Sequence, residues 1–143
     1  MAQDPTCVFC RIVSGQIPSA RLIETDSAIA FLDINPIAPG HTLLVPREHA
    51  ATMADASPAL ISAAAAELPR LTRAILAATG AKGLNIIQNN GREAGQLVDH
   101  VHFHLVPRSA EDAIRIHWSQ GKYQGTAMEE MRSRIVQNLS GGG

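Results

Sequence analysis

Histidines occupy alternate positions at His100, His102 and His104, with apolar residues between them. Successive side chains of a β-strand point to opposite faces, so on a strand these imidazoles would share one face, roughly 6 to 7 Å apart. Such a row could surround a phosphate or contribute to a metal site, although a straight strand makes it awkward for all three to bind one ion. The plainer interpretation is the polar outer face of a half-buried strand. We favour a chemical role, because chance explains such a row poorly.

The only cysteines, Cys7 and Cys10, form a Cys-x-x-Cys pair near the N-terminus. Two intervening residues would strain a disulfide loop but suit a pair of thiolate ligands. The alternative is a pair of small, buried apolar side chains. The spacing favours a metal site in a reducing compartment.

The composition is that of a globular chain. Its 143 residues are 45% hydrophobic and 17% charged, with a formal net charge of -1. A chain of this length and composition can bury one hydrophobic core without needing disulfides or metal ions for stability. We expect a single domain over residues 1–140 and a disordered tail over 141–143. Lysine and arginine are scattered, which argues against a nucleic-acid polymer as partner. No segment has the roughly 18 apolar residues of a membrane span or resembles a signal peptide, so we expect a cytoplasmic protein without a membrane partner.

The elements that must position these residues begin with a short helix or turn that carries both cysteines. Asp4 and Pro5 suit its start and Gly15 suits its end. Alternating apolar residues and turn formers then predict a hairpin, a loop and further strands. The strands are expected over residues 21–24, 28–32, 41–45, 84–88 and 101–106, with loops over 33–40 and 89–96.

Two helices complete the predicted fold. Ser57 and Pro58 suit a helix start, and apolar residues recur at helical spacing until Gly80. Pro69 should kink this helix or divide it in two, and we favour one long kinked helix. Thr126 begins a final helix with a capping signature. The sequence therefore predicts an α+β fold, an antiparallel sheet with a long central helix and a C-terminal helix.

On these motifs the sequence resembles the histidine triad (HIT) family, whose signature is His-x-His-x-His followed by apolar residues. The resemblance covers nearly the whole chain, and its pieces are specific because they occur in order. They lie at residues 7–12, 15, 18, 31–36, 39–46, 89, 91, 94–96 and 100–108. The resemblance implies a homodimer of α+β subunits whose sheets join, and a purine nucleotide or nucleotide conjugate bound against the histidine strand.

The resemblance also implies an enzyme in which the middle histidine, His102, attacks the α-phosphorus. A covalent nucleotidyl-histidine would form and then be hydrolysed by water. Neutral imidazole is a competent nucleophile near pH 7, because its reference pKa is about 6.5, provided that a partner such as a backbone carbonyl fixes the tautomer. His104 is expected to contact phosphate and to be a candidate proton donor to the leaving group.

The same resemblance assigns the remaining nucleotide contacts. Asp33 would accept from the ribose hydroxyls and Ile34 would pack on the base, although Asp33 also suits a turn at a strand end. Asn89 and Gln96 would hold phosphate or leaving group through amide donors, and Gly95 would permit backbone approach. Two further pocket residues are implied, His41 and Leu97. A lone histidine at a strand start is more often structural.

Leu97 departs from the family pattern, because many members carry serine or threonine at this position. The missing hydroxyl puts strong phosphoramidase activity in doubt and favours a changed leaving-group preference. Two alternatives therefore stay open: a dinucleoside polyphosphate hydrolase, and a nucleotide-binding module with little turnover.

Bacterial members that open with Cys-x-x-Cys are known for structural zinc, with ligands that map to Cys7, Cys10, His49 and His100. A Cys2His2 set completes a tetrahedron, so His100 would serve zinc rather than phosphate. A third alternative, a zinc-dependent nucleic-acid binder, would need a basic surface that this chain lacks.

Overall fold

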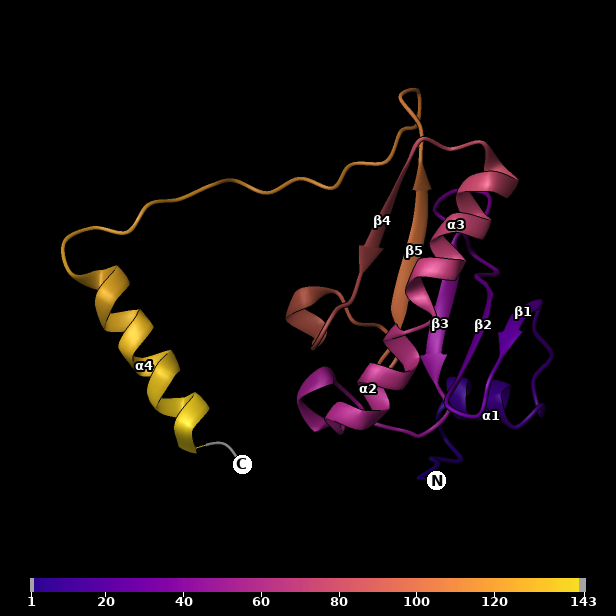
Figure 1. Ribbon diagram of the computed structural model, residues 1–143, viewed down its shortest axis with the longest axis horizontal. Helices are drawn as coiled ribbons and strands as arrows, with labels where there is room; N and C mark the ends of the chain where they lie inside the picture. The colour runs from indigo at the N-terminus through magenta and orange to yellow at the C-terminus, as the bar shows by residue number, and fades with distance from the viewer. Residues whose placement is uncertain (1, 142–143) are drawn as a thin grey trace. The chain divides into compact units, whose positions relative to one another are not determined.

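A computed structural model describes residues 2–141 of the chain (Figure 1). Its contacts form two compact units, Met1–Ala113 and Ile114–Gly143. The first unit contains a five-stranded sheet in the order β1-β2-β3-β5-β4, with antiparallel neighbours throughout. The strands are β1 (Arg21–Glu24), β2 (Ala28–Leu32), β3 (Thr42–Pro46), β4 (Gly83–Ile87) and β5 (Phe103–Arg108). The predicted α+β class with an antiparallel sheet is confirmed.

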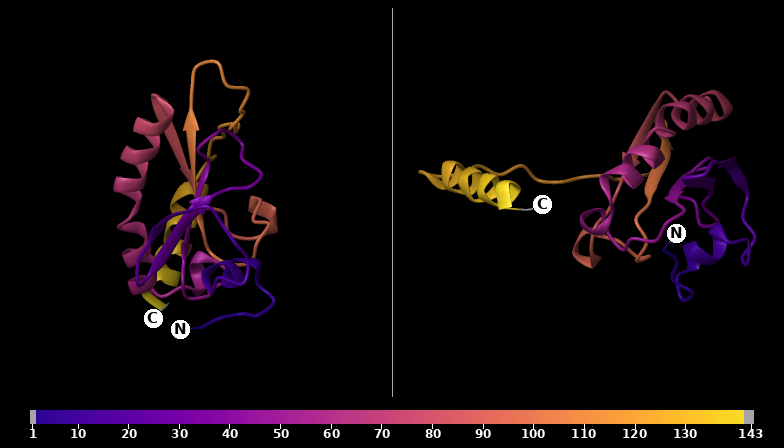
Figure 2. Two further views of the ribbon diagram at one scale, coloured as in Figure 1. Left: turned by 90° about the vertical axis from the view of Figure 1, so that its right-hand side faces the viewer. Right: turned by 60° about the horizontal axis from the view of Figure 1, so that its bottom comes forward.

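Both faces of the sheet are apolar, and different helices cover them. On one face Ala28, Leu44 and Leu105 pack with buried residues of the second and third helices. On the other face Ile29 and Phe31 pack with buried residues of the first helix, as the alternation of side chains along a strand requires. These helices are α1 (Val8–Val13), α2 (Pro58–Ala65) and α3 (Leu68–Thr79). Figure 2 shows α3 and α1 on opposite sides of the sheet.

The first hairpin agrees with the sequence prediction in both strands. Thr25 closes its turn, because the Thr25 hydroxyl accepts from the backbone N–H groups of Ser27 and Ala28 at 3.2 and 3.0 Å. β3 begins at Thr42, one residue later than expected. Helix α1 also begins later than expected, with Cys7 rather than Asp4 as its N-cap. Both cysteines therefore lie at the first turn of α1.

The expectation of one long kinked central helix is wrong. α2 ends at Ala65 and α3 begins at Leu68, so the segment forms two helices. Pro69 lies in the first turn of α3, where a residue without a backbone N–H is tolerated because that group would have no helical acceptor. Proline thus divides the segment instead of bending it.

The expected strand over residues 101–106 is also shifted, because β5 begins at Phe103. Before it, the N–H of His100 donates to Val98 at 2.9 Å and the N–H of Val101 donates to Ala50 at 2.8 Å. These bonds belong to a turn and a loop contact rather than to the sheet. His100 and His102 therefore precede the strand, and the expectation of one strand face shared by three histidines is wrong.

The second unit contains the predicted C-terminal helix, α4 (Ala127–Gly141). The capping signature that begins at Thr126 predicts Glu129, three residues later, as its partner. Instead the Thr126 hydroxyl donates to Glu130 at 2.8 Å, while Glu129 pairs with Arg132 at 2.7 Å. The expected domain over residues 1–140 spans both units. Gly141, expected in a disordered tail, ends α4, and residues 142–143 lie outside the described residues. Within residues 2–141, no helix has the length and apolarity needed to cross a bilayer.

Gly40 offers a test of how tightly the loop before β3 packs. Its φ is +95°, and a Cβ there would lie 2.7 Å from Cγ2 of Thr79 on α3. We expect Gly40→Ala to lower the free energy of unfolding by about 1–2 kcal/mol for the left-handed backbone and by a further amount of about 1–3 kcal/mol for overpacking.

Gly15→Ala is the matched control for this prediction, because Gly15 has a φ of +83° and nothing within 4 Å of its added Cβ. Only the backbone cost applies there. Urea denaturation of both variants measures the difference, and equal losses of stability would contradict the close packing of Gly40.

Candidate active site and cysteine–histidine cluster

A cavity of about 550 Å³ opens on the side of the sheet that α1 covers. Seven of the residues expected to contact a nucleotide line it: Asp33, Ile34, Asn89, Gly95, Leu97, His102 and His104. Its volume is in the range of sites for small organic ligands. Among the described residues that line it there is no lysine or arginine, and Asp33 is the only carboxylate. The structure thus gathers most of the expected residues around one space with little positive charge.

The tautomer of His102 follows from its hydrogen bond. Its Nδ1 lies 2.7 Å from the carbonyl oxygen of His100, and because a carbonyl only accepts, Nδ1 carries the proton. Nε2 then keeps its lone pair. The ring is 7% exposed, and burial lowers its pKa against the opposing effects of the His100 carbonyl and of Asp33. His102 is therefore neutral near pH 7 and offers an unprotonated nitrogen.

A second chain of hydrogen bonds sets the tautomer of His104. The backbone N–H of Ile37 donates to Nδ1 of His41 at 3.1 Å, so the proton of His41 is on Nε2. That Nε2 lies 2.9 Å from Nδ1 of His104 and donates to it. His104 consequently carries its own proton on Nε2. Burial, followed by the neighbouring His102 and His41, lowers the pKa of His104 from 6.5 to about 4, so its N–H is a neutral donor.

His41 does not line the cavity. It is 2% exposed and acts through His104, and its Nε2 also lies 3.7 Å from Oδ2 of Asp33. Asp33 has a turn role as well, because its Oδ1 accepts from the backbone N–H of Asn35 at 2.8 Å. The second oxygen faces the histidines. Ile34 is 89% exposed at the cavity, where its side chain is free to pack on a flat ligand.

The side chain of Gln96 lies inside the loop between β4 and β5 and binds backbone groups there. Its side chain is buried, its amide N–H groups donate to Ala51 and Val98 at 2.7 and 2.9 Å, and its oxygen accepts from Gly91 at 2.8 Å. Both amide donors are therefore used within the protein in this structure, and the expected contact of Gln96 with phosphate stays a prediction. Gln96 braces the loop that presents Leu97, which is 78% exposed at the cavity.

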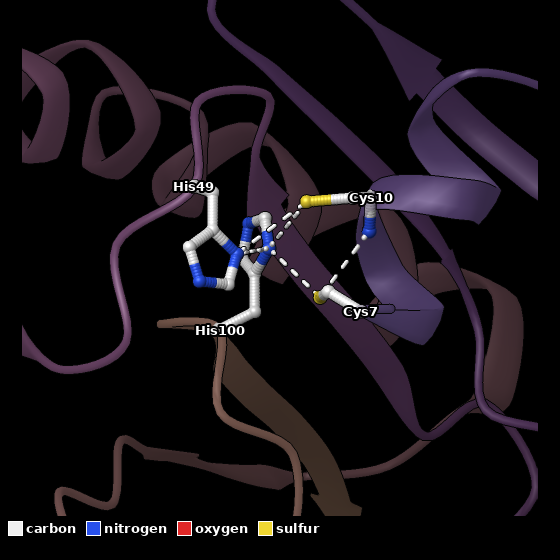
Figure 3. Close-up of side chains that lie close together, drawn as sticks. All are labelled: Cys7, Cys10, His49 and His100. Atoms are coloured by element: carbon white, nitrogen blue, oxygen red, sulfur yellow. Dashed lines mark hydrogen bonds between the residues drawn. The ribbon is translucent and has the colours of Figure 1, made fainter. Parts of the chain in front are cut away.

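Cys7, Cys10, His49 and His100 lie together, and Figure 3 shows their side chains converging. Nε2 of His100 donates to the carbonyl of Pro46 at 2.8 Å, so Nδ1 of His100 presents a lone pair to the thiols. A histidine that ligates a metal commonly donates its other N–H to such a carbonyl. Burial lowers the pKa of His100 to about 4 and raises the pKa of the Cys10 thiol.

The spacing of these four donors fits a tetrahedral zinc ion. With Zn–S bonds of about 2.3 Å and Zn–N bonds of about 2.05 Å, the S···N edges would be about 3.6 Å and the N···N edge about 3.3 Å. The Sγ atoms of Cys7 and Cys10 lie 3.5 and 3.6 Å from Nδ1 of His100, and Cys10 lies 3.4 Å from Nδ1 of His49. The two Nδ1 atoms are 3.2 Å apart. The cluster is thus arranged as a metal site would be.

Sequence reasoning did not find the part that Phe9 plays in the site. The Phe9 ring meets the His102 ring edge-on, with centroids 4.9 Å apart and planes at 86°, and it lies 6.0 Å from the His100 ring. Phe9 was not among the residues that the sequence placed in the site. Its place between the two cysteines was visible in the sequence, but its contact with a residue 93 positions later had no local signal.

Several known proteins are similar to this chain in sequence, and several solved structures are similar to it in fold. The chain is 45% identical over 107 residues to adenosine 5'-monophosphoramidase hnt1 of Schizosaccharomyces pombe, which covers 75% of this chain and 77% of that protein. The crystal structure of SMU.412c from Streptococcus mutans UA159 superimposes with a TM-score of 0.92 at 38% identity, covering 96% of this chain and 88% of the other.

A further solved structure is relevant to the cysteine–histidine cluster. A Zn-bound histidine triad family protein from Mycobacterium smegmatis superimposes with a TM-score of 0.72 at 34% identity, covering 95% of this chain and 97% of the other. The family model of the HIT domain matches residues 14–111, so Cys7 and Cys10 lie before the matched range. Given this match and the arrangement of His100, His102 and His104, the chain belongs to the histidine triad (HIT) family.

Proposed function

We propose that this protein hydrolyses purine nucleotide conjugates at the α-phosphate through a covalent nucleotidyl intermediate on His102. One observation carries the proposal: the bond from Nδ1 of His102 to the His100 carbonyl leaves the Nε2 lone pair available in the cavity. The name of the S. pombe relative, an adenosine 5'-monophosphoramidase, supports the reaction class. Nucleotidyl transfer to an acceptor other than water would use the same intermediate.

In the first step Nε2 of His102 attacks phosphorus, the Nε2–P bond forms, and the bond from phosphorus to the leaving group breaks. The Nε2–H of His104 donates a hydrogen bond to phosphate or to the departing atom, and the departing atom takes its proton from water. The positive charge that develops on His102 is stabilised by Asp33 and by the His100 carbonyl. In the second step water attacks phosphorus, the Nε2–P bond breaks, the His102 ring returns to its neutral form, and the proton lost by the water passes to solvent.

The charges that line the cavity favour a conjugate with one phosphate. A dinucleoside polyphosphate carries several negative charges, and the described lining residues supply no lysine or arginine to neutralise them. His102 and His104 are both neutral near pH 7. We therefore rank a dinucleoside polyphosphate hydrolase below a phosphoramidase. A nucleotide-binding module with little turnover is a weaker proposal as well, because the tautomers of both histidines suit transfer.

We propose further that Cys7, Cys10, His49 and His100 hold a structural zinc ion. The donor-to-donor distances support it, as does the Zn-bound relative of known structure. When bound, zinc would keep the thiols deprotonated and join α1 to residues 49 and 100. A location in the reducing cytoplasm stays a prediction.

A homodimer is also proposed. β4 lies at one edge of the sheet and its Ile86 is 47% exposed. An edge strand presents unpaired backbone groups to a partner strand. Pairing of β4 with a second copy would join the two sheets.

His102→Ala should abolish turnover while leaving nucleotide affinity within about tenfold, because it removes the nucleophile but few ground-state contacts. Turnover of an adenosine phosphoramidate, calorimetric binding of AMP, and intact-mass detection of the adduct after quenching without acid make up the measurement. His117→Ala changes an exposed histidine of the second unit and controls for loss of a ring. More than a few per cent of residual activity in pure His102→Ala would reject the nucleophile.

The double variant Cys7→Ser and Cys10→Ser should lose zinc and melt several degrees lower, because the metal links ligands from separate segments. Elemental analysis and thermal unfolding measure both effects. Wild-type protein purified without chelators and found free of zinc would refute the metal site.

Leu97→Ser should raise turnover of the phosphoramidate relative to diadenosine polyphosphate, on the premise that the new hydroxyl reaches the departing group. Such a bond in the transition state is worth about 2 to 4 kcal/mol, so the gain could reach about a few hundredfold. Leu97→Ala is the matched control, since it removes the apolar side chain without adding a donor. The ratio of kcat/KM for the two substrates is measured in all three proteins, and an unchanged ratio in Leu97→Ser removes Leu97 from leaving-group selection.

A further inference from the structure

We propose that the cysteine–histidine cluster is a positioning device for the nucleophile, acting through the peptide group that joins His100 to Val101. The proposal rests on His102 as the nucleophile. It gives the cluster a part in the reaction besides holding the fold together, and it makes His49 a positioning residue that does not touch the substrate.

The tautomer of His102 depends on the direction of one peptide group. The carbonyl that receives Nδ1–H of His102 belongs to the same peptide group as the N–H of Val101, which donates to the carbonyl of Ala50 at 2.8 Å. The described chain contains no cis peptide bond, so the N–H and C=O of this group point in opposite directions. The bond to Ala50 therefore aims the His100 carbonyl at His102.

The cluster ties together the two segments that make the bond between Val101 and Ala50. His49 directly precedes Ala50, and His100 directly precedes Val101. The rings of His49 and His100 meet at 3.2 Å between their Nδ1 atoms, and Sγ of Cys10 lies within 3.6 Å of both (Figure 3). The cluster thus sets the separation of the donor and acceptor backbones one residue away from each ligand.

A third contact leads from the same cluster to the nucleophile ring itself. Phe9 lies on α1 between the two cysteines, and its ring is edge-on to His102 at 4.9 Å. An edge-to-face contact restricts rotation of the imidazole about its bond to Cβ. Since both thiols anchor this turn of α1 to His100, the cluster also holds Phe9 against the His102 ring.

Opening the cluster would therefore change the reaction more than it changes binding. The peptide group between residues 100 and 101 would be free to turn, and the proton of His102 could move from Nδ1 to Nε2. A protonated Nε2 has no lone pair with which to attack phosphorus. His49 and Ala50 do not line the cavity, so contacts with the nucleotide would persist. The expected signature is a lower kcat with an almost unchanged KM.

The test uses His49→Ala in the full chain, which keeps the other three cluster donors. Ring 15N shifts of His102, assigned by their absence in His102→Ala, report the tautomer, and kcat and KM are measured on the phosphoramidate. We expect partial loss of the Nδ1–H tautomer, a kcat lower by about tenfold to a hundredfold, as for residues that orient an active group, and a KM within about threefold. Leu71→Ala is the control, because Leu71 is buried in the core on the other face of the sheet.

A folded His49→Ala protein with the wild-type tautomer and kcat would overturn the proposal, as would an equal loss of kcat in Leu71→Ala, which would reduce the effect to stability. If His49→Ala does not fold, Cys7→Ser gives the same two readouts, because Cys7 contacts His100 at 3.5 Å. Failure of the proposed function is distinguishable: His102→Ala would then retain turnover, whatever the ring shifts of His49→Ala report.

Discussion

The hydrogen bond of 2.7 Å between Nδ1 of His102 and the carbonyl of His100 is the interaction on which the candidate site depends. A carbonyl accepts and never donates, so this single contact decides which ring nitrogen carries the proton. Two contacts hold that carbonyl in place. They are the hydrogen bond of the same peptide group from Val101 to Ala50 and the packing of the His100 side chain within the cysteine–histidine cluster. A small error in the direction of one peptide group would remove the lone pair from the cavity.

The same principle governs His41, which is buried, and His104, which is half-buried. The N–H of Ile37 assigns the proton of His41, and His41 in turn assigns that of His104. Burial lowers the pKa of His41 and, together with the neighbouring His102 and His41, lowers the pKa of His104 to about 4, so both rings are neutral near pH 7. The cavity therefore offers lone pairs and N–H groups instead of cations. This favours a phosphate with a single charge and separates the chemistry from that of sites built on arginine and lysine clusters.

The sheet explains how these groups stay in place. The central strand β3 is buried on both faces, because Leu44 packs with the core under α2 and α3 while Leu43 and Val45 pack with the core under α1. Its neighbour β5 packs on the side of α2 and α3 through Phe103 and Leu105. His41 directly precedes β3 and His104 lies within β5, so both rings stand on well-packed backbone. The loop after β4 has no such support, and the buried amide of Gln96 holds it by three hydrogen bonds to backbone groups. An exposed Leu97 is thereby presented on a braced loop.

By itself the sequence determined the features that depend on residues close together in the chain. Period-two alternation and turn formers placed β1 and β2, and the motif resemblance named seven residues that the structure brings to one cavity, because both signals lie within short stretches of chain. The division at Pro69, the start of β5 at Phe103 and the role of Gln96 were settled only in three dimensions. In the last two cases the reason is a long-range backbone partner. The Ala50 carbonyl accepts the N–H of Val101 that a strand would have used, and the Ala51 carbonyl accepts an amide N–H of Gln96. No spacing within the motif records either contact.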